Sequence, residues 1–292
     1  MLEGILLKVY SGFYYVFAAD RVWECSLRGR FRIKGGEFFP GDRVRILPGT
    51  GNKATIEAVA ERRNSLVRPV IANVDQALLV FALTAPEPDT NLLDRMLIQA
   101  ALAGIKPVLV FTKIDKLDLQ SNHDFGAAGL YEGLGYPVFR VSSKTGQGIT
   151  ELKQCLPEKV TVLAGPSGVG KSSLLNALAP GLSLKTGDVS RKVSRGRHTT
   201  RHVELLVCSG GLVADTPGFS SLDLPAMKRE DLAWYFPEIS LYLGKCRFNS
   251  CLHDKEPDCA VKEAVESGKI AAGRYEHYIL FLREVIAAER RY

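Results

Sequence analysis

Long apolar runs are absent from this 292-residue sequence, and its longest runs, such as ALLVFAL, are far too short to span a bilayer. The first residues, MLEGILLKVYSG, lack a basic leader and a small-residue cleavage pattern, so they do not resemble a secretory signal. We therefore expect a cytoplasmic protein without a membrane partner.

Cysteine is also scarce, with six residues in the whole chain. Six cysteines in a chain of this length do not form a disulfide framework. Three of the six nevertheless crowd between Cys246 and Cys259 with a histidine among them, which indicates a metal site. Cys25, Cys155 and Cys208 lie in apolar contexts and are expected to be packed residues.

A strong excess of one charge is missing, since the formal net charge is only +6, but the charge is unevenly distributed. Residues 1–68 hold 12 Lys and Arg against 7 Asp and Glu, which gives +5 of the +6. This local excess favours a polyanion such as nucleic acid as partner, although a solvated surface explains it almost as well.

The N-terminal part consists of short alternating runs broken by glycine and charged turns, which predicts five strands in a small OB-like barrel. Such barrels often bind oligonucleotides. A plain β-domain with a charged loop is the alternative. The loop LRGRFRIKGG gathers basic side chains around an aromatic ring: Arg28, Arg30, Phe31, Arg32 and Lys34.

From about Pro69 the pattern changes to strand, helix, strand, which predicts a parallel α/β architecture. The apolar runs VDQALLVFAL, KPVLVFTKID, YPVFRVSSKTG and KVTVLAG are the expected strands, and residues 91–104 form an amphipathic helix. After about Leu222 the sequence becomes helical, interrupted by the Cys/His segment.

The segment GPSGVGKS, residues 165–172, fits the phosphate-loop pattern G-x-x-x-x-G-K-S between an apolar strand and a helix. The glycines let consecutive backbone N–H groups face phosphate oxygens. Lys171 is expected to span the β- and γ-phosphates, and the Ser172 hydroxyl to ligate Mg²⁺. The predicted nucleotide-binding residues here are Gly165, Pro166, Ser167, Gly168, Val169, Gly170, Lys171, Ser172 and Ser173.

A second phosphate motif, LVADTPGF, places Asp215 and Gly218 in a D-x-x-G arrangement after another apolar strand. Asp215 is expected to hold Mg²⁺ and the Gly218 N–H to sense the γ-phosphate. The basic segment SRKVSRGRHTTRHVEL before it suits a switch loop whose threonine completes the Mg²⁺ shell. Thr199 is the favoured ligand and Thr200 the alternative, and an ordinary charged loop remains a second interpretation.

The sequence TKID predicts guanine recognition by Lys113 and Asp115. A carboxylate accepts hydrogen bonds from both the guanine N1–H and the exocyclic amine, whereas adenine offers no such donor pair. Thr112 stands where GTPases usually have asparagine, and it is included among the predicted nucleotide-binding residues. The segment SSKTG resembles the element whose backbone amides meet the guanine carbonyl, and its predicted contacts are Ser142, Ser143 and Lys144.

The segment CRFNSCLHDKEPDC supplies three thiolates and one imidazole with the spacing C-x4-C-x-H-x5-C. Such a closed set favours a structural Zn²⁺ without an open catalytic position. Buried free cysteines are the alternative. The predicted zinc ligands are Cys246, Cys251, His253 and Cys259.

The motif order is guanine turn, guanine loop, phosphate loop, switch threonine and D-x-x-G, which is the usual GTPase set rotated. With the barrel in front and the Cys/His segment behind, the whole chain resembles the RsgA family of circularly permuted GTPases of small ribosomal subunit biogenesis. The resemblance implies a monomeric, Mg²⁺-dependent GTPase that binds the small (30S) subunit and its rRNA in late maturation. Hydrolysis of GTP to GDP would be stimulated by the subunit.

The predicted fold class is thus multidomain α/β. We expect an OB-fold-like RNA-binding barrel at residues 1–66, a circularly permuted P-loop GTPase domain with a parallel sheet at 67–222, and a helical zinc-binding domain at 223–292. The D-x-x-G loop leads straight into this last region, so nucleotide state is hypothesised to reposition it.

The catalytic residues are predicted to be His198, Lys171 and Thr199. Phe219 follows the D-x-x-G motif where many GTPases place a water-orienting glutamine, and its ring cannot hydrogen-bond, so slow intrinsic hydrolysis is expected. The resemblance supports His198 in that role once the ribosomal subunit orders the loop. A histidine that only contacts RNA or solvent is the alternative.

Three other functions remain open at the level of sequence. The nucleotide fold could serve as a passive switch in an rRNA clamp, an interpretation that Phe219 favours. A permuted GTPase of the large subunit is disfavoured by the barrel and the zinc spacing, and a signalling GTPase by the basic residues of the barrel.

Overall fold

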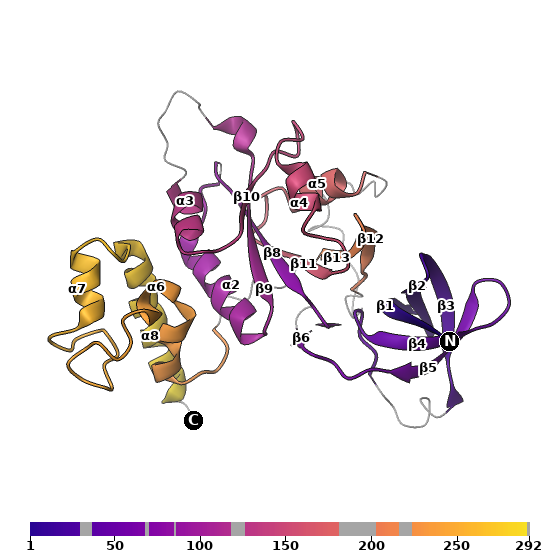
Figure 1. The fold of residues 1–292 in the computed structure, drawn as a ribbon, viewed down its shortest axis with the longest axis horizontal. Helices are drawn as coiled ribbons and strands as arrows, with labels where there is room; N and C mark the ends of the chain where they lie inside the picture. The colour runs from indigo at the N-terminus through magenta and orange to yellow at the C-terminus, as the bar shows by residue number, and fades with distance from the viewer. Residues whose placement is uncertain are drawn as a thin grey trace, which may run out of the picture.

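The computed structural model describes residues 1–29, 37–67, 70–84, 86–117, 126–180, 203–215 and 224–290. A small β-barrel, a central sheet flanked by helices and a helical C-terminal part follow one another along the chain (Figure 1). This architecture confirms the predicted fold class. None of the described helices is long and apolar enough to cross a membrane.

Five strands close the N-terminal barrel in the order β1-β2-β3-β5-β4. Strands β3 and β5 pair in parallel and the other neighbours are antiparallel. Alternate side chains point inward, so Leu6, Trp23 and Ile56 meet in one core. The strands are β1 (Leu2–Tyr10), β2 (Phe13–Ala18), β3 (Arg21–Leu27), β4 (Arg43–Pro48) and β5 (Lys53–Val59).

The basic loop between β3 and β4 is described only in part. Arg28 forms an ion pair with Glu57 of β5. The predicted RNA-contacting residues Arg30, Phe31, Arg32 and Lys34 lie outside the described residues.

The central sheet has the strand order β10-β9-β8-β11-β13-β12. Its first five strands are parallel, and β12 pairs antiparallel with β13 at the edge. A short hairpin of β6 (Ser65–Val67) and β7 (Val70–Ala72) precedes it. The sheet strands are β8 (Gln76–Ala82), β9 (Lys106–Thr112), β10 (Val138–Arg140), β11 (Val160–Ala164), β12 (Leu206–Cys208) and β13 (Gly211–Asp215).

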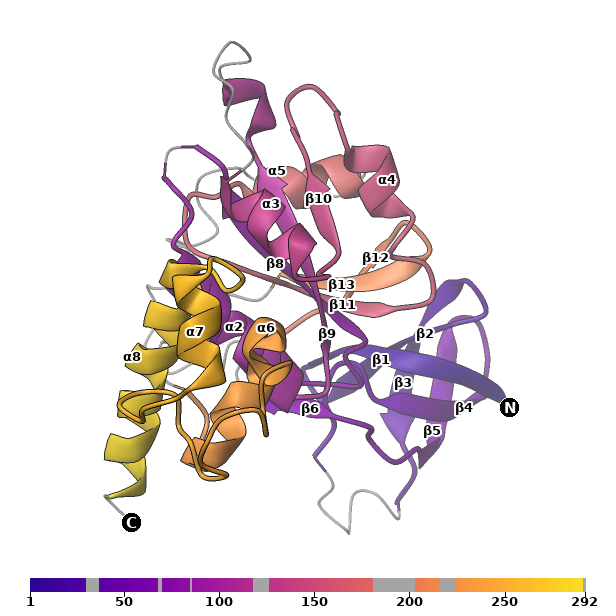
Figure 2. The same ribbon diagram turned by 60° about the vertical axis from the view of Figure 1, so that its left-hand side comes forward.

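Helices cover both faces of this sheet (Figure 2). Leu79 and Phe81 of β8 pack with α2 (Thr90–Leu102) and α3 (Gly126–Gly133), whereas Leu78 and Val80 pack with α4 (Ile149–Lys153) and α5 (Lys171–Leu178). Because both faces are buried, the strands are apolar throughout rather than alternating.

The C-terminal part contains η3 (Arg229–Tyr235), α6 (Pro237–Ser240), α7 (Ala260–Glu266) and α8 (Ala272–Glu289). Phe236, Tyr278 and Phe281 form its aromatic centre. Ile98 of α2 belongs to the same apolar cluster. The core of the C-terminal part therefore continues onto α2, which packs on the central sheet.

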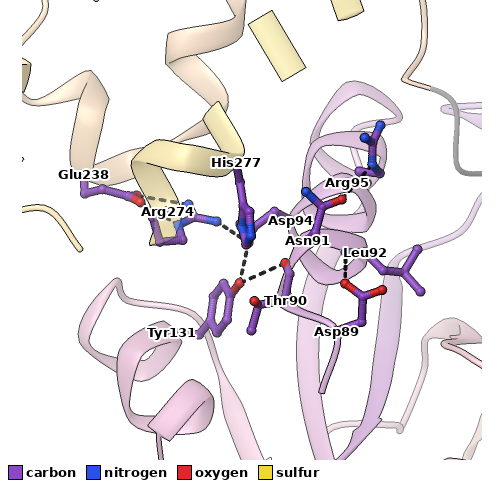
Figure 3. Close-up of polar contacts among 10 residues, drawn as sticks. All are labelled: Asp89, Thr90, Asn91, Leu92, Asp94, Arg95, Tyr131, Glu238, Arg274 and His277. Carbon is purple, nitrogen blue, oxygen red and sulfur yellow. Dashed lines mark hydrogen bonds and ion pairs between the residues drawn. The ribbon is translucent and has the colours of Figure 1, made fainter. Parts of the chain in front are cut away.

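A buried polar network completes this junction (Figure 3). Asp94 of α2 accepts hydrogen bonds from Arg274 of α8 and from the Tyr131 hydroxyl of α3, and its Oδ2 lies 2.6 Å from His277 Nδ1. Arg274 Nε also donates to Glu238 of α6 at 2.6 Å. Burial opposes the charge of Arg274, but the bond to Glu238 and the nearby Asp94 raise its pKa above the ordinary value. Ionic and apolar contacts together therefore seat the C-terminal part on α2 and α3.

Candidate functional site

The predicted nucleotide motifs meet at one edge of the central sheet. Gly165 follows β11, Lys113 follows β9, and Asp215 is the last residue of β13. Ser142 comes two residues after β10. Since these strands run parallel, their carboxyl ends share one edge, where open α/β sheets bind ligands. The rotated motif order in the sequence therefore leaves the spatial grouping intact.

The phosphate loop passes close to strand β8. A Cβ at Gly165, whose φ is 144°, would lie 2.0 Å from the Val80 carbonyl oxygen, so only glycine fits there. The Lys171 ammonium donates to the carbonyl oxygens of Gly165 and Pro166 at 2.9 and 2.8 Å. Helix α5 starts at this lysine without a side-chain cap, so its N-terminus is suited to an anion.

The guanine turn is a left-handed residue followed by one 3₁₀ turn. Lys113 has a φ of 62°, and η1 (Ile114–Lys116) carries the exposed Asp115. The buried Ser142 hydroxyl donates to Asp115 Oδ1 at 2.6 Å and accepts from the Thr145 N–H at 3.2 Å. The bond from Ser142 lowers the pKa of Asp115 below its usual range. The hydrogen bond therefore favours the ionised carboxylate, which accepts hydrogen bonds and does not donate them.

Thr112 lies between the guanine turn and the phosphate loop. Its side chain is only 2% exposed, and its hydroxyl oxygen lies 2.5 Å from the Val169 carbonyl oxygen and 3.2 Å from that of Phe81. Sequence reasoning placed Thr112 among the nucleotide-contacting residues in the usual place of asparagine. The structure shows it bonded to the phosphate loop, a contact 57 residues away along the chain that no local pattern indicates.

The remaining predicted residues divide into two groups, those that the structure places and those outside the described ranges. Gly170, Ser172 and Ser173 are half-buried at the start of α5. Ser143 is half-buried and Lys144 exposed in the loop after β10, and Ser167 and Gly168 are exposed in the phosphate loop. His198, Thr199, Thr200, Gly218 and Phe219 lie outside the described residues. The functional roles of both groups stay predictions.

The four predicted metal ligands lie together in the C-terminal part, with their ligand atoms all within 4.8 Å of one another. Cys246 Sγ is 3.8 Å from Cys259 Sγ, and His253 Nδ1 is 3.5 and 3.4 Å from those two sulfurs. With Zn–S and Zn–N bonds of about 2.3 and 2.0 Å, a tetrahedral site has S–S distances of about 3.8 Å and S–N distances of about 3.5 Å. The donor set and its spacing therefore fit a zinc ion.

The protein around this cluster fixes the ligand loop. The hydroxyls of Tyr275 and Tyr278 donate to the carbonyl oxygens of His253 and Leu252 at 2.6 and 2.9 Å. Burial raises the pKa of Cys251 to about 12. A bound metal ion would oppose this shift, because it binds the thiolate form. None of the six cysteines is in a disulfide. The close spacing of the four ligand atoms and the tyrosine bonds to the ligand loop favour a structural metal site over packed free cysteines.

Two family models match the chain, the RsgA GTPase over residues 59–225 and the RsgA N-terminal domain over residues 3–56. Among curated proteins, the small ribosomal subunit biogenesis GTPase RsgA of Moorella thermoacetica is 53% identical over 292 residues and covers 100% of both chains. The protein of the same name from Geobacillus kaustophilus is 48% identical over 293 residues, also with 100% of both chains covered.

Solved structures agree with these matches. YloQ, described as a circularly permuted GTPase, superposes with a TM-score of 0.82 at 40% identity, covering 99% of this chain and 96% of its own. YjeQ from Thermotoga maritima gives a TM-score of 0.82 at 39% identity, with 98% of each chain covered. The likeness thus extends over all three parts of the structure.

Proposed function

The chain belongs to the RsgA GTPase family and is a GTP phosphohydrolase, and on this premise we propose that it binds the small ribosomal subunit and acts in its late maturation. Hydrolysis would depend on Mg²⁺ and be stimulated by the subunit. One observation carries the nucleotide assignment: the guanine turn and the phosphate loop meet at one sheet edge, bonded through Thr112 and Val169. The subunit assignment is supported by the names of the relatives.

The proposed nucleotide contacts follow from the geometry of this edge. Asp115, held ionised by Ser142, would accept from the guanine edge, and the loop after β10 would donate its backbone amides. Lys171 would leave the loop carbonyls and bind the β- and γ-phosphates. Bound Mg²⁺, held by Ser172, Thr199 and Asp215, would offset charge on the phosphate oxygens.

Water orientation is proposed to fall to His198, because Phe219 has no hydrogen-bonding group. A neutral imidazole has one nitrogen that accepts a hydrogen bond, so it can orient a water molecule. Subunit-stimulated hydrolysis that survives a His198→Ala substitution would reject this role.

The other assignments concern the parts around the GTPase sheet. We propose domain limits at residues 1–66, 67–222 and 223–292, and one structural Zn²⁺ at the Cys/His cluster. The barrel and the C-terminal domain would contact rRNA, and the protein would act as a monomer in the cytoplasm.

The decisive experiment measures GTP turnover and co-sedimentation with purified small and large subunits. We expect turnover to rise only with small subunits, and binding to depend on the nucleotide. Unchanged turnover together with binding would favour the passive rRNA clamp, and stimulation by large subunits would favour a GTPase of large-subunit assembly.

A further inference from the structure

Strand β1 contains a bulge whose extra side chain packs against the central sheet rather than inside the barrel. Its pairing with β2 shifts between Leu6↔Val16 and Lys8↔Tyr15, so Leu7 is the extra residue. The Leu6 side chain lies in the barrel core, whereas Leu7, 5% exposed, lies in the core of the central sheet. A bulge redirects a side chain in this way.

The same bulge binds the chain that leads into β12. The Leu7 carbonyl oxygen accepts from the Leu205 N–H at 3.0 Å, and Lys8 Nζ lies 2.7 Å from Glu204 Oε1. Leu205 is buried in the same core as Leu7. Two successive residues of the barrel thus bind two successive residues before β12.

These contacts lie close in the chain to two of the three segments that carry predicted Mg²⁺ ligands. Residues 204–205 follow the segment 181–202, which carries Thr199 and His198. Strand β12 pairs antiparallel with β13, with Leu206 opposite Val213, and β13 ends at Asp215.

A second set of contacts joins the barrel to β7 and to the residue after it. The Ala72 N–H donates to the Pro40 carbonyl oxygen at 2.8 Å, and Asn73 Nδ2 donates to that of Gly41 at 2.9 Å. A Cβ at Gly41 would lie 1.9 Å from the Ala72 carbonyl oxygen. The barrel is therefore joined to the rest of the structure at two places, the β1 bulge and residues 40–41.

We propose that the β1 bulge is the joint through which the barrel positions the chain leaving segment 181–202, with Lys8 and Glu204 as positioning residues for stimulated hydrolysis. The proposal rests on the proposed function, because it assumes that the small subunit binds the barrel. It assigns the barrel a part in activation as well as in binding.

Charge reversal across the ion pair tests the joint. Glu204→Lys and Lys8→Glu should each lower subunit-stimulated kcat about two- to fivefold, the range of an exposed ion pair, with intrinsic turnover and GDP affinity unchanged. The double variant, with the charges exchanged, should recover to within about twofold of the wild type. Glu204→Lys adds positive charge, so a lower stimulated kcat in this variant cannot come from a missing contact with an rRNA phosphate.

Lys53→Glu on β5 is the matched control for Lys8→Glu, since it makes the same charge change at an exposed barrel position. Each variant is also tested for co-sedimentation with small subunits, which separates binding from activation. If both single variants are stimulated like Lys53→Glu, the joint is disproved while the proposed function stands. If the wild type neither binds nor responds to subunits, the proposed function fails, and the inference fails with it.

Deletion of Leu7 gives an independent test. The deletion brings the pairs Leu6↔Val16 and Lys8↔Tyr15 next to each other and so restores a regular ladder. Circular dichroism would verify folding. A folded variant should bind subunits with at least a tenfold lower stimulated kcat, and wild-type stimulation would overturn the proposal. If the deletion prevents folding, the charge-reversal series decides.

Discussion

The Thr112 hydroxyl donates to the Val169 carbonyl oxygen, with 2.5 Å between the two oxygens, and so joins the end of β9 to the phosphate loop. Both residues are buried. The two halves of the nucleotide site therefore keep their spacing through a protein contact.

Replacing Thr112 with valine keeps the shape of the side chain and removes this bond. The Val169 carbonyl would lose its partner, which costs about 1 kcal/mol or more, so we expect GDP affinity to fall about fivefold. Calorimetric titration with GDP measures the change. Thr112→Ser keeps the hydroxyl and serves as the control, and equal affinities of the valine and serine variants would contradict the bracing role.

Asp115→Asn tests the choice of base. The amide keeps one acceptor and gains a donor, so it suits xanthine, whose C2 carbonyl replaces the guanine amine. We expect GDP affinity to fall at least tenfold while XDP affinity rises, because each mismatched hydrogen bond at the base costs about 1–3 kcal/mol. Competition titrations with GDP, XDP and ADP measure this. Unchanged preference for GDP would place the base elsewhere.

Ser142→Ala tests the support of Asp115 through the pH dependence of binding. The bond from Ser142 lowers the pKa of Asp115, so the ionised form persists to lower pH than for an ordinary aspartate. GDP binding that needs the carboxylate is lost as pH falls through this pKa. Without the hydroxyl the pKa rises, and the loss should occur at higher pH in titrations between pH 3 and 7. Superimposable pH profiles would exclude the support.

Arg274→Met tests the buried network of Figure 3. The substitution leaves the Asp94 and Glu238 carboxylates buried without their shared cation, which costs about 3–5 kcal/mol. Urea unfolding should show this loss. Arg283→Met, an exposed position on the same helix α8, is the control and should change stability by less than about 0.5 kcal/mol. Equal stability of the two variants would show that the network does not hold the domains together.

Cys251→Ser tests the metal site. Loss of one thiolate from a closed set of four should abolish stoichiometric zinc and unfold the C-terminal part at lower temperature. Metal analysis and calorimetric unfolding, with and without a chelator, measure both effects. Cys155→Ser, outside the cluster, should keep one zinc per chain. Full zinc content in Cys251→Ser would remove this cysteine from the ligand set.

The sequence alone determined the features that depend on neighbouring residues. The glycine loop before α5, the Lys113 turn and the Cys/His segment are each encoded within a few positions, because their chemistry needs fixed residue types at short spacing. The apolar runs likewise specified the buried strands of the sheet. Edge strand β12 was not predicted, since three residues before a Ser-Gly-Gly turn carry little periodic signal.

Tertiary structure alone decided the contacts between segments that lie far apart in the chain. The bond from Thr112 to Val169 spans 57 residues, and that from Arg274 to Asp94 spans 180. At the Leu7 bulge, strand β1 pairs with β2 and also accepts a hydrogen bond from Leu205, which lies far along the chain. Such polar pairings depend on how helices and strands pack. The sequence of one segment therefore does not specify which distant residue it will bind.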